Sequence, residues 1–72
     1  MMDEIKENIN AYVDKHGTTI VELAKAVGIS RSSLYDKMAG RSPWMLNDVI
    51  SLADHMGCSV QDLLTSPTQG VA

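Results

Sequence analysis

The sequence lacks most of the features that mark secreted or membrane proteins. Cys58 is its one cysteine, so no internal disulfide can form, and a reducing cytoplasm fits this best. No apolar run approaches the roughly 20 residues that a membrane span needs. The acidic residues 1–4 lack the basic-then-apolar layout of a signal peptide. We therefore expect a cytoplasmic protein with no membrane partner.

Aromatic residues are scarce as well, since phenylalanine does not occur and Trp44, Tyr12 and Tyr35 are the only aromatics. With 72 residues the chain holds one domain, and such a domain buries only about 60% of the surface of its unfolded chain. Hydrophobic residues make up 44% of the sequence, which argues against disorder. The core must therefore be aliphatic, with the five methionines as adaptable fillers.

The net charge of −3 speaks against nucleic acid, but the charge is unevenly distributed. Residues 25–41 hold Lys25, Arg31, Lys37 and Arg41 against Asp36 alone, a local net charge of +3, and the rest of the chain carries −6. A basic segment on an acidic body is typical of a protein that binds DNA in one orientation. Two solvated helices with unrelated charges would give the same count.

Helical periodicity predicts an all-α chain of five helices, and no alternating strand pattern competes with it. The first helix is expected over about residues 3–15, on an apolar stripe of Ile5, Ile9 and Val13. The second begins at Thr19, in a capping box with Glu22, and ends at residue 28.

The third helix is expected from the capping Ser30 to about residue 39, with only Leu34 and Met38 facing inward. Ser42 and Pro43 predict the start of a fourth helix, as its cap and first residue. Its predicted inward stripe is Leu46, Val49, Ile50, Ala53 and Met56. A short fifth helix follows Ser59, with Val60, Leu63 and Leu64 inward, and residues 65–72 are predicted to form a flexible tail.

The stretch Glu22–Arg41 has the parts of a helix-turn-helix at roughly residues 19–40. A tight turn at residues 28–30 joins the two helices, and Gly28 permits its sharp bend. Ala24 is small enough for the next helix to approach closely. Because so few residues hold the third helix inward, its first half is left to enter a major groove.

This stretch resembles the Cro and phage-repressor helix-turn-helix family, also called the XRE family, and the likeness continues over residues 42–64, which follow that family's fourth and fifth helices. The resemblance implies a compact five-helix, lambda-repressor-like DNA-binding domain over residues 1–64, with helices 2 and 3 as the helix-turn-helix. It implies a double-stranded operator, a homodimer on half-sites about 34–36 Å apart, and a bacterial or phage-infected host cytoplasm. Ile20 departs from the family, which often has a DNA-contacting Gln there; Ile20 either packs inward or touches a thymine methyl.

The resemblance also implies which residues meet DNA. Arg31 is placed for a bidentate contact with guanine, against the alternative of a phosphate or solvated cation. Ser32 and Ser33 either bond bases or phosphates or are ordinary first-turn residues. Ser30 is expected to be a cap first and a phosphate ligand second.

Further along, Tyr35 either reaches a phosphate or sugar or is partly buried against a neighbouring helix. Asp36 either accepts from cytosine, excludes wrong sequences, or is a surface carboxylate. Lys37 and Arg41 are expected on backbone phosphates. Trp44 either flanks the DNA, fills a dimer contact, or is a half-buried surface aromatic.

No catalytic constellation can be named, and neither His16 nor His55 has partners at zinc-ligand spacing. We expect no enzyme, cofactor, metal or small-molecule ligand, and Cys58 is expected to pack in the core. The sequence thus predicts a sequence-specific transcriptional regulator, of Cro or repressor type, that occupies an operator and blocks transcription. The alternative is a protein-interaction module on the same fold, antitoxin-like or an adaptor, which Ile20 and the acidic total favour.

Overall fold

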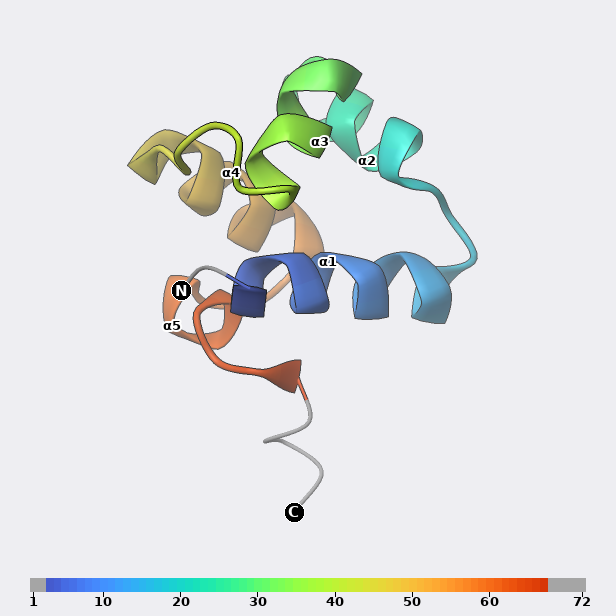
Figure 1. Cartoon of the computed structure of the whole chain (residues 1–72). Coiled ribbons are helices and arrows are strands. Elements are labelled where there is room, and N and C mark those ends of the chain that lie inside the picture. The colour runs from blue at the N-terminus through green and yellow to red at the C-terminus, as the bar shows by residue number, and fades with distance from the viewer. Residues whose placement is uncertain (1–2, 68–72) are drawn as a thin grey trace.

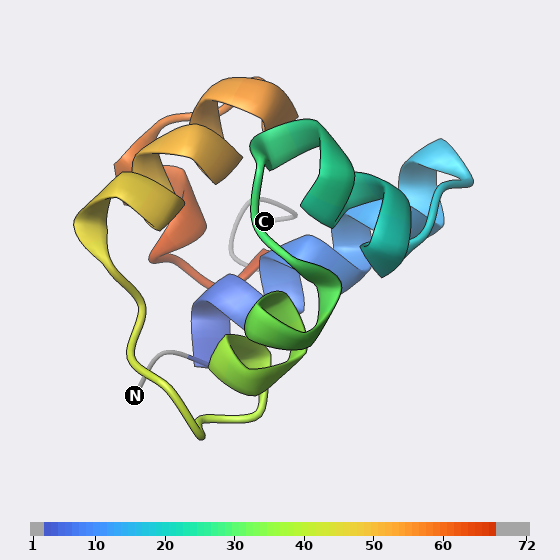
Figure 2. The ribbon, with the colours of Figure 1, turned by 90° about the horizontal axis from the view of Figure 1, so that it is seen from above.

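The computed structural model describes residues 3–67, and within them the chain forms five helices and no strand (Figure 1). The helices are α1 Asp3–His16, α2 Ile20–Val27, α3 Arg31–Met38, α4 Leu46–Met56 and α5 Val60–Leu63. Figure 1 places α2 and α3 above α1, with α4 beside them and α5 below. The view from above in Figure 2 shows α3 crossing over the first half of α1. The predicted all-α, five-helix architecture is confirmed.

The core is aliphatic, as the scarcity of aromatic residues predicts. Side chains from all five helices form one buried cluster: Ile5, Ile9, Leu23, Ala24, Leu34, Val49, Leu52, Ala53 and Leu63. Helix α2 lies at the centre and packs against α1, α3 and α4. Helix α3 contributes Leu34 to this cluster, and Met38 is half-buried and packs against it, so the two predicted inward residues of α3 are confirmed.

The turn of the predicted helix-turn-helix is built as its residues indicate. The Thr19 hydroxyl accepts from the Glu22 N–H at 3.1 Å and caps α2, which is one half of the predicted capping box. The other half is not found, because no bond from the Thr19 N–H to the Glu22 carboxylate forms among the described residues. Gly28 ends α2 at a φ of 75°, a left-handed conformation that glycine adopts without steric cost. The Ile29 N–H then bonds the Ala24 carbonyl at 3.0 Å, which closes the turn before Ser30 caps α3.

The start of α4 was predicted wrongly. Ser42 and Pro43 lie in a loop, and the helix begins only at Leu46, with Met45 at its N-cap. The Ser42 N–H is used at the end of α3, where it bonds the Asp36 carbonyl at 3.3 Å. The carboxylate of Asp48 instead accepts from the Met45 N–H at 3.1 Å. The N-terminus of α4 is thus capped by the side chain of Asp48, which lies inside the helix, and not by the side chain of its apolar N-cap residue Met45.

The predicted inward stripe of α4 is also partly wrong. Val49 and Ala53 are buried and Met56 packs on the core, but Leu46 is 69% exposed and Ile50 47% exposed. Leu52, outside the predicted stripe, is fully buried instead. On α5, Leu64 is 45% exposed although it was predicted to face inward.

The chain beyond α5 is attached to α1 as far as it is described. The Asn8 amide donates to the Thr65 carbonyl at 2.8 Å, and the Ser66 hydroxyl bonds a Glu7 carboxylate oxygen at 3.1 Å. Residues 68–72 of the predicted tail lie outside the described residues. The domain boundary at residue 64 stays a prediction, although two residues beyond it contact α1.

Candidate nucleic-acid interface

The outward side of α3 is polar and accessible. Each helical residue advances by about 100° around the axis, so Ser32 and Asp36 lie opposite Leu34. Leu34 is fully buried, whereas Arg31 and Ser32 are exposed and Tyr35 is 44% exposed. Most of the helix circumference, including its first turn, therefore faces away from the core.

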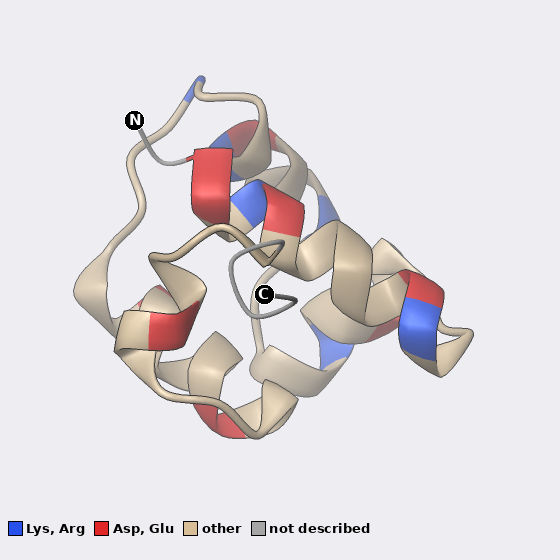
Figure 3. Ribbon diagram, turned by 90° about the horizontal axis from the view of Figure 1, so that it is seen from below, with Lys and Arg blue, Asp and Glu red and all other residues tan. Residues whose placement is uncertain are grey.

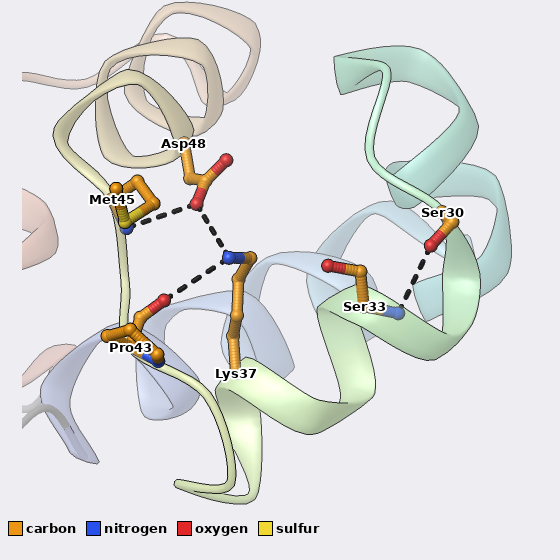
Figure 4. Close-up of polar contacts among 6 residues, drawn as sticks. All are labelled: Ser30, Ser33, Lys37, Pro43, Met45 and Asp48. Atoms are coloured by element: carbon orange, nitrogen blue, oxygen red, sulfur yellow. Dashed lines mark hydrogen bonds and ion pairs between the residues drawn. The ribbon is translucent and has the colours of Figure 1, made fainter.

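One backbone N–H in the first turn of α3 is satisfied by a side chain. The Ser30 hydroxyl accepts from the Ser33 N–H at 3.2 Å, so the expected capping role of Ser30 is confirmed (Figure 4). Ser33 is half-buried. Arg31 follows the cap directly, and no ion pair involves it within residues 3–67. Its guanidinium keeps a full positive charge at the surface of the helix-turn-helix.

Asp36 and Arg41 form a second polar feature at the other end of α3. The Arg41 Nε lies 3.0 Å from Asp36 Oδ1, and both side chains are substantially exposed. The backbone N–H of Arg41 also bonds the Asp36 carbonyl, at 2.8 Å. One aspartate thus holds the start of the α3–α4 loop, residues 39–45, through both its carbonyl and its carboxylate.

Lys37 has a different environment from the one expected for a phosphate ligand. Its Nζ lies 3.0 Å from Asp48 Oδ2 and donates to the Pro43 carbonyl at 3.2 Å (Figure 4). The Lys37 side chain is only 11% exposed and that of Asp48 only 18%. Asp48 was missed by sequence reasoning. The sequence gives only one indication of this role: Asp48 is an acidic residue in the first turn of α4, where a carboxylate stabilises the helix N-terminus.

Two apolar residues near this surface turn inward. Trp44 is half-buried and packs on the core, in line with the surface-aromatic alternative. Ile20 also packs on the core, so of its two predicted positions the inward one is found.

The loop between Met38 and Trp44 and the first turns of α1 line an open pocket of about 590 Å³.

The charge is distributed unevenly over the molecule. Seen from below in Figure 3, α1 carries both acidic and basic segments and α5 carries an acidic one, on the side opposite α2 and α3. The tip of the α3–α4 loop carries a basic segment, which the sequence assigns to Arg41. Of the four cations in residues 25–41, Lys37 and Arg41 form ion pairs, and Lys25 and Arg31 are exposed. The positive field of the helix-turn-helix is therefore weaker than the charge count predicts.

Outside α3 and the α3–α4 loop, the histidines and Cys58 are candidates for a second site. The Tyr12 ring lies between two histidines, with centroids 4.2 Å from His16 and 6.2 Å from His55. Cys58 is half-buried and packs against the core, and burial, with a smaller effect of Asp62, raises the pKa of its thiol. Over residues 3–67 no cluster of His, Cys, Asp or Glu is arranged to hold a metal ion. No described helix is long and apolar enough to cross a bilayer.

Two short helices joined by a glycine turn, the second of them held by one buried leucine, define a helix-turn-helix domain. The family model of the Cro/C1-type HTH DNA-binding domain matches residues 8–69 of the chain. The chain therefore belongs to the Cro/C1-type helix-turn-helix family, and it is a DNA-binding domain of that family. Comparisons with characterised proteins and with solved structures find no match.

Proposed function

We propose that the protein is a sequence-specific transcriptional regulator that occupies an operator in double-stranded DNA and represses transcription by blocking polymerase. The observation that carries this proposal is the accessible outward side of α3, where Arg31 and Ser32 are exposed in the first turn and Leu34 alone is fully buried. A helix held in this way enters a major groove with its first turn against base edges.

The side chains at this surface divide by role. Arg31 reads guanine through its two-pronged guanidinium, and Ser32 and Tyr35 complete the contact with bases and sugar-phosphate. Ser33 and Ser30 lie at the edge of the groove, where their hydroxyl groups donate to a phosphate. Arg41 contacts the phosphate backbone and sets the register of the domain.

Asp36 acts against wrong sequences, because a carboxylate in the groove accepts a hydrogen bond only from cytosine or adenine amino groups and repels acceptors. Trp44 supports the loop from beneath and flanks the backbone with its accessible edge. The protein binds as a homodimer, because a single short motif buries too little surface for useful affinity. Two copies then occupy half-sites about 34–36 Å apart.

The test is selection of bound duplexes from a random pool, followed by a salt series on the selected duplex. We expect a repeated half-site, whose spacing reports the dimer, and an affinity that falls steeply as salt rises. Saturable binding that is equally tight to scrambled duplexes would contradict the sequence-specific reading. Repression is then measured with the selected site placed over a promoter.

A protein-interaction module is the second candidate, and one observation favours it. Met45, Leu46 and Ile50 are large apolar side chains, and all three are exposed at the start of α4. Exposed apolar residues close together often mark a protein contact. The same salt series separates the two functions, because an adaptor or antitoxin-like protein without DNA affinity shows no saturable duplex binding.

A further inference from the structure

The α3–α4 loop is fixed mainly by polar contacts. It has no helical hydrogen bonds between Gly40 and Met45, and the open pocket of about 590 Å³ lies between it and the first turns of α1. Its first half is held by the Asp36 carbonyl, which accepts from the N–H groups of Arg41 and Ser42. In the second half, the Trp44 side chain packs on the core, and the backbone around it is held by a separate polar contact at Pro43.

Lys37 supplies this attachment. Its ammonium joins three parts of the chain, since it extends from the last turn of α3, donates to the Pro43 carbonyl at 3.2 Å and pairs with Asp48 in the first turn of α4 at 3.0 Å. The same Asp48 oxygen accepts from the Met45 N–H. Figure 4 shows these contacts meeting at one point between the two helices.

The same geometry argues against the phosphate contact that the sequence predicts for Lys37. An ammonium has three donors, and here two are directed at protein acceptors while the side chain is 11% exposed. To reach a phosphate, Lys37 would have to leave a carboxylate that would then stay unpaired at 18% exposure. The pair is also neutral, so it adds no net attraction for DNA.

We propose that Lys37 and Asp48 act together as positioning residues, which hold the α3–α4 loop so that Arg41 reaches a phosphate while α3 occupies the groove. This inference rests on the proposed DNA-binding function. It assigns a role to Asp48, whose negative charge would by itself be expected to weaken DNA binding. Neither Lys37 nor Asp48 contacts DNA in this arrangement.

The test uses the full chain and the duplex selected from the random pool. Lys37→Met keeps the apolar stem and removes the charge, and Asp48→Asn keeps an acceptor for the Met45 N–H but breaks the ion pair. We expect each variant to bind about five- to tenfold more weakly, the effect of one lost charge-assisted contact. In an Arg41→Ala background both should have little further effect, because they act through Arg41.

The direction of the change in duplex affinity caused by Asp48→Asn distinguishes a positioning Lys37 from a phosphate-binding Lys37. A phosphate-binding Lys37 would be released by this variant, and the loss of a negative charge would strengthen duplex binding. A merely structural role would not make the effect depend on Arg41. Denaturant unfolding of each variant confirms that binding is measured on folded protein, and Lys25→Met serves as the control for loss of one exposed cation on α2.

Weaker binding by Asp48→Asn that disappears in the Arg41→Ala background supports the inference. Stronger binding by Asp48→Asn, or an undiminished Lys37→Met effect in the Arg41→Ala background, overturns it and leaves the proposed function standing. If the wild-type chain shows no saturable duplex binding, the proposed function fails, and this inference fails with it.

Discussion

Arg41 and Asp36 are paired at the end of α3, with the arginine Nε 3.0 Å from an aspartate oxygen and 65% and 47% of the two side chains exposed. An exposed pair of this kind contributes about 0–1 kcal/mol, so the guanidinium is readily transferred to a stronger acceptor. A DNA phosphate is such an acceptor. In the proposed complex, Asp36 therefore competes with the DNA backbone for Arg41.

We expect Asp36→Asn to strengthen binding to every duplex. The variant removes a negative charge from the outward side of α3 and frees Arg41 for a phosphate. The gain should be about three- to tenfold at low salt and shrink as salt rises. The ratio between the affinities for selected and scrambled duplexes should fall, because the carboxylate no longer repels wrong acceptors.

The matched control for Asp36→Asn is Asp54→Asn, which removes one exposed carboxylate from the last turn of α4. Duplex titrations at three salt concentrations compare the two. Equal gains from both variants would mean that only the net charge changed, and would remove Asp36 from the proposed interface.

Arg31→Ala should relax sequence preference more than Lys37→Ala does. Arg31 is exposed in the first turn of α3, and a bidentate arginine contact with guanine discriminates by about 1–3 kcal/mol. Competition binding with operators mutated at each position locates the loss. For Lys25→Ala we expect a uniform, modest weakening at all sequences. Uniform weakening by Arg31→Ala as well would identify Arg31 as a phosphate ligand.

Local signals in the sequence were sufficient for the helix-turn-helix. Capping by Thr19 and Ser30, the left-handed Gly28 and the buried Leu34 each depend on neighbours within a few residues, and all are found in the structure. The aliphatic core was also predicted correctly from the sequence. These features follow from short-range hydrogen bonding and helical periodicity.

The region after α3 was predicted less well because its structure depends on distant partners. Ser42 and Pro43 have the pattern of a helix start, but the Ser42 N–H is taken by α3 and Asp48 caps α4 at Met45. Lys37 looks like a surface cation until α4 brings Asp48 beside it. Tertiary contacts of this kind leave no local periodicity in the sequence.

Cys58 gives a prediction on pH. Burial first, and then the nearby Asp62 carboxylate, raise the pKa of its thiol, so the folded state favours the protonated form. Its contribution to stability is then complete below the ordinary thiol pKa and is lost as pH rises through the raised value. The free energy of unfolding of the wild type should therefore fall relative to that of Cys58→Ala above a pH of about 8. Parallel curves for the two proteins would show that the thiol environment does not change on folding.

Asn8 connects α1 to the end of α5, and its removal should destabilise the whole domain. The two N–H groups of the Asn8 amide are shared among three carbonyls, with Nδ2 2.8 Å from Thr65 and from Glu4 and 3.1 Å from Leu63. The last carbonyls of a helix have no partner within it, so Asn8 satisfies groups that the chain leaves open. We expect Asn8→Ala to lower the free energy of unfolding by about 1–3 kcal/mol.

The control is Asn10→Ala, an exposed position on the same helix. Both substitutions gain the same helix propensity, so the difference between their denaturant midpoints isolates the contacts to α5. Asn8→Asp sharpens the comparison, because it keeps the shape but replaces the donor with an acceptor that repels the carbonyls. If Asn8→Ala and Asn10→Ala unfold at the same midpoint, α5 is held by packing against α1 and α4 and not by the Asn8 hydrogen bonds. If Asn8→Asp is the least stable of the three, the donated hydrogen bonds carry the connection.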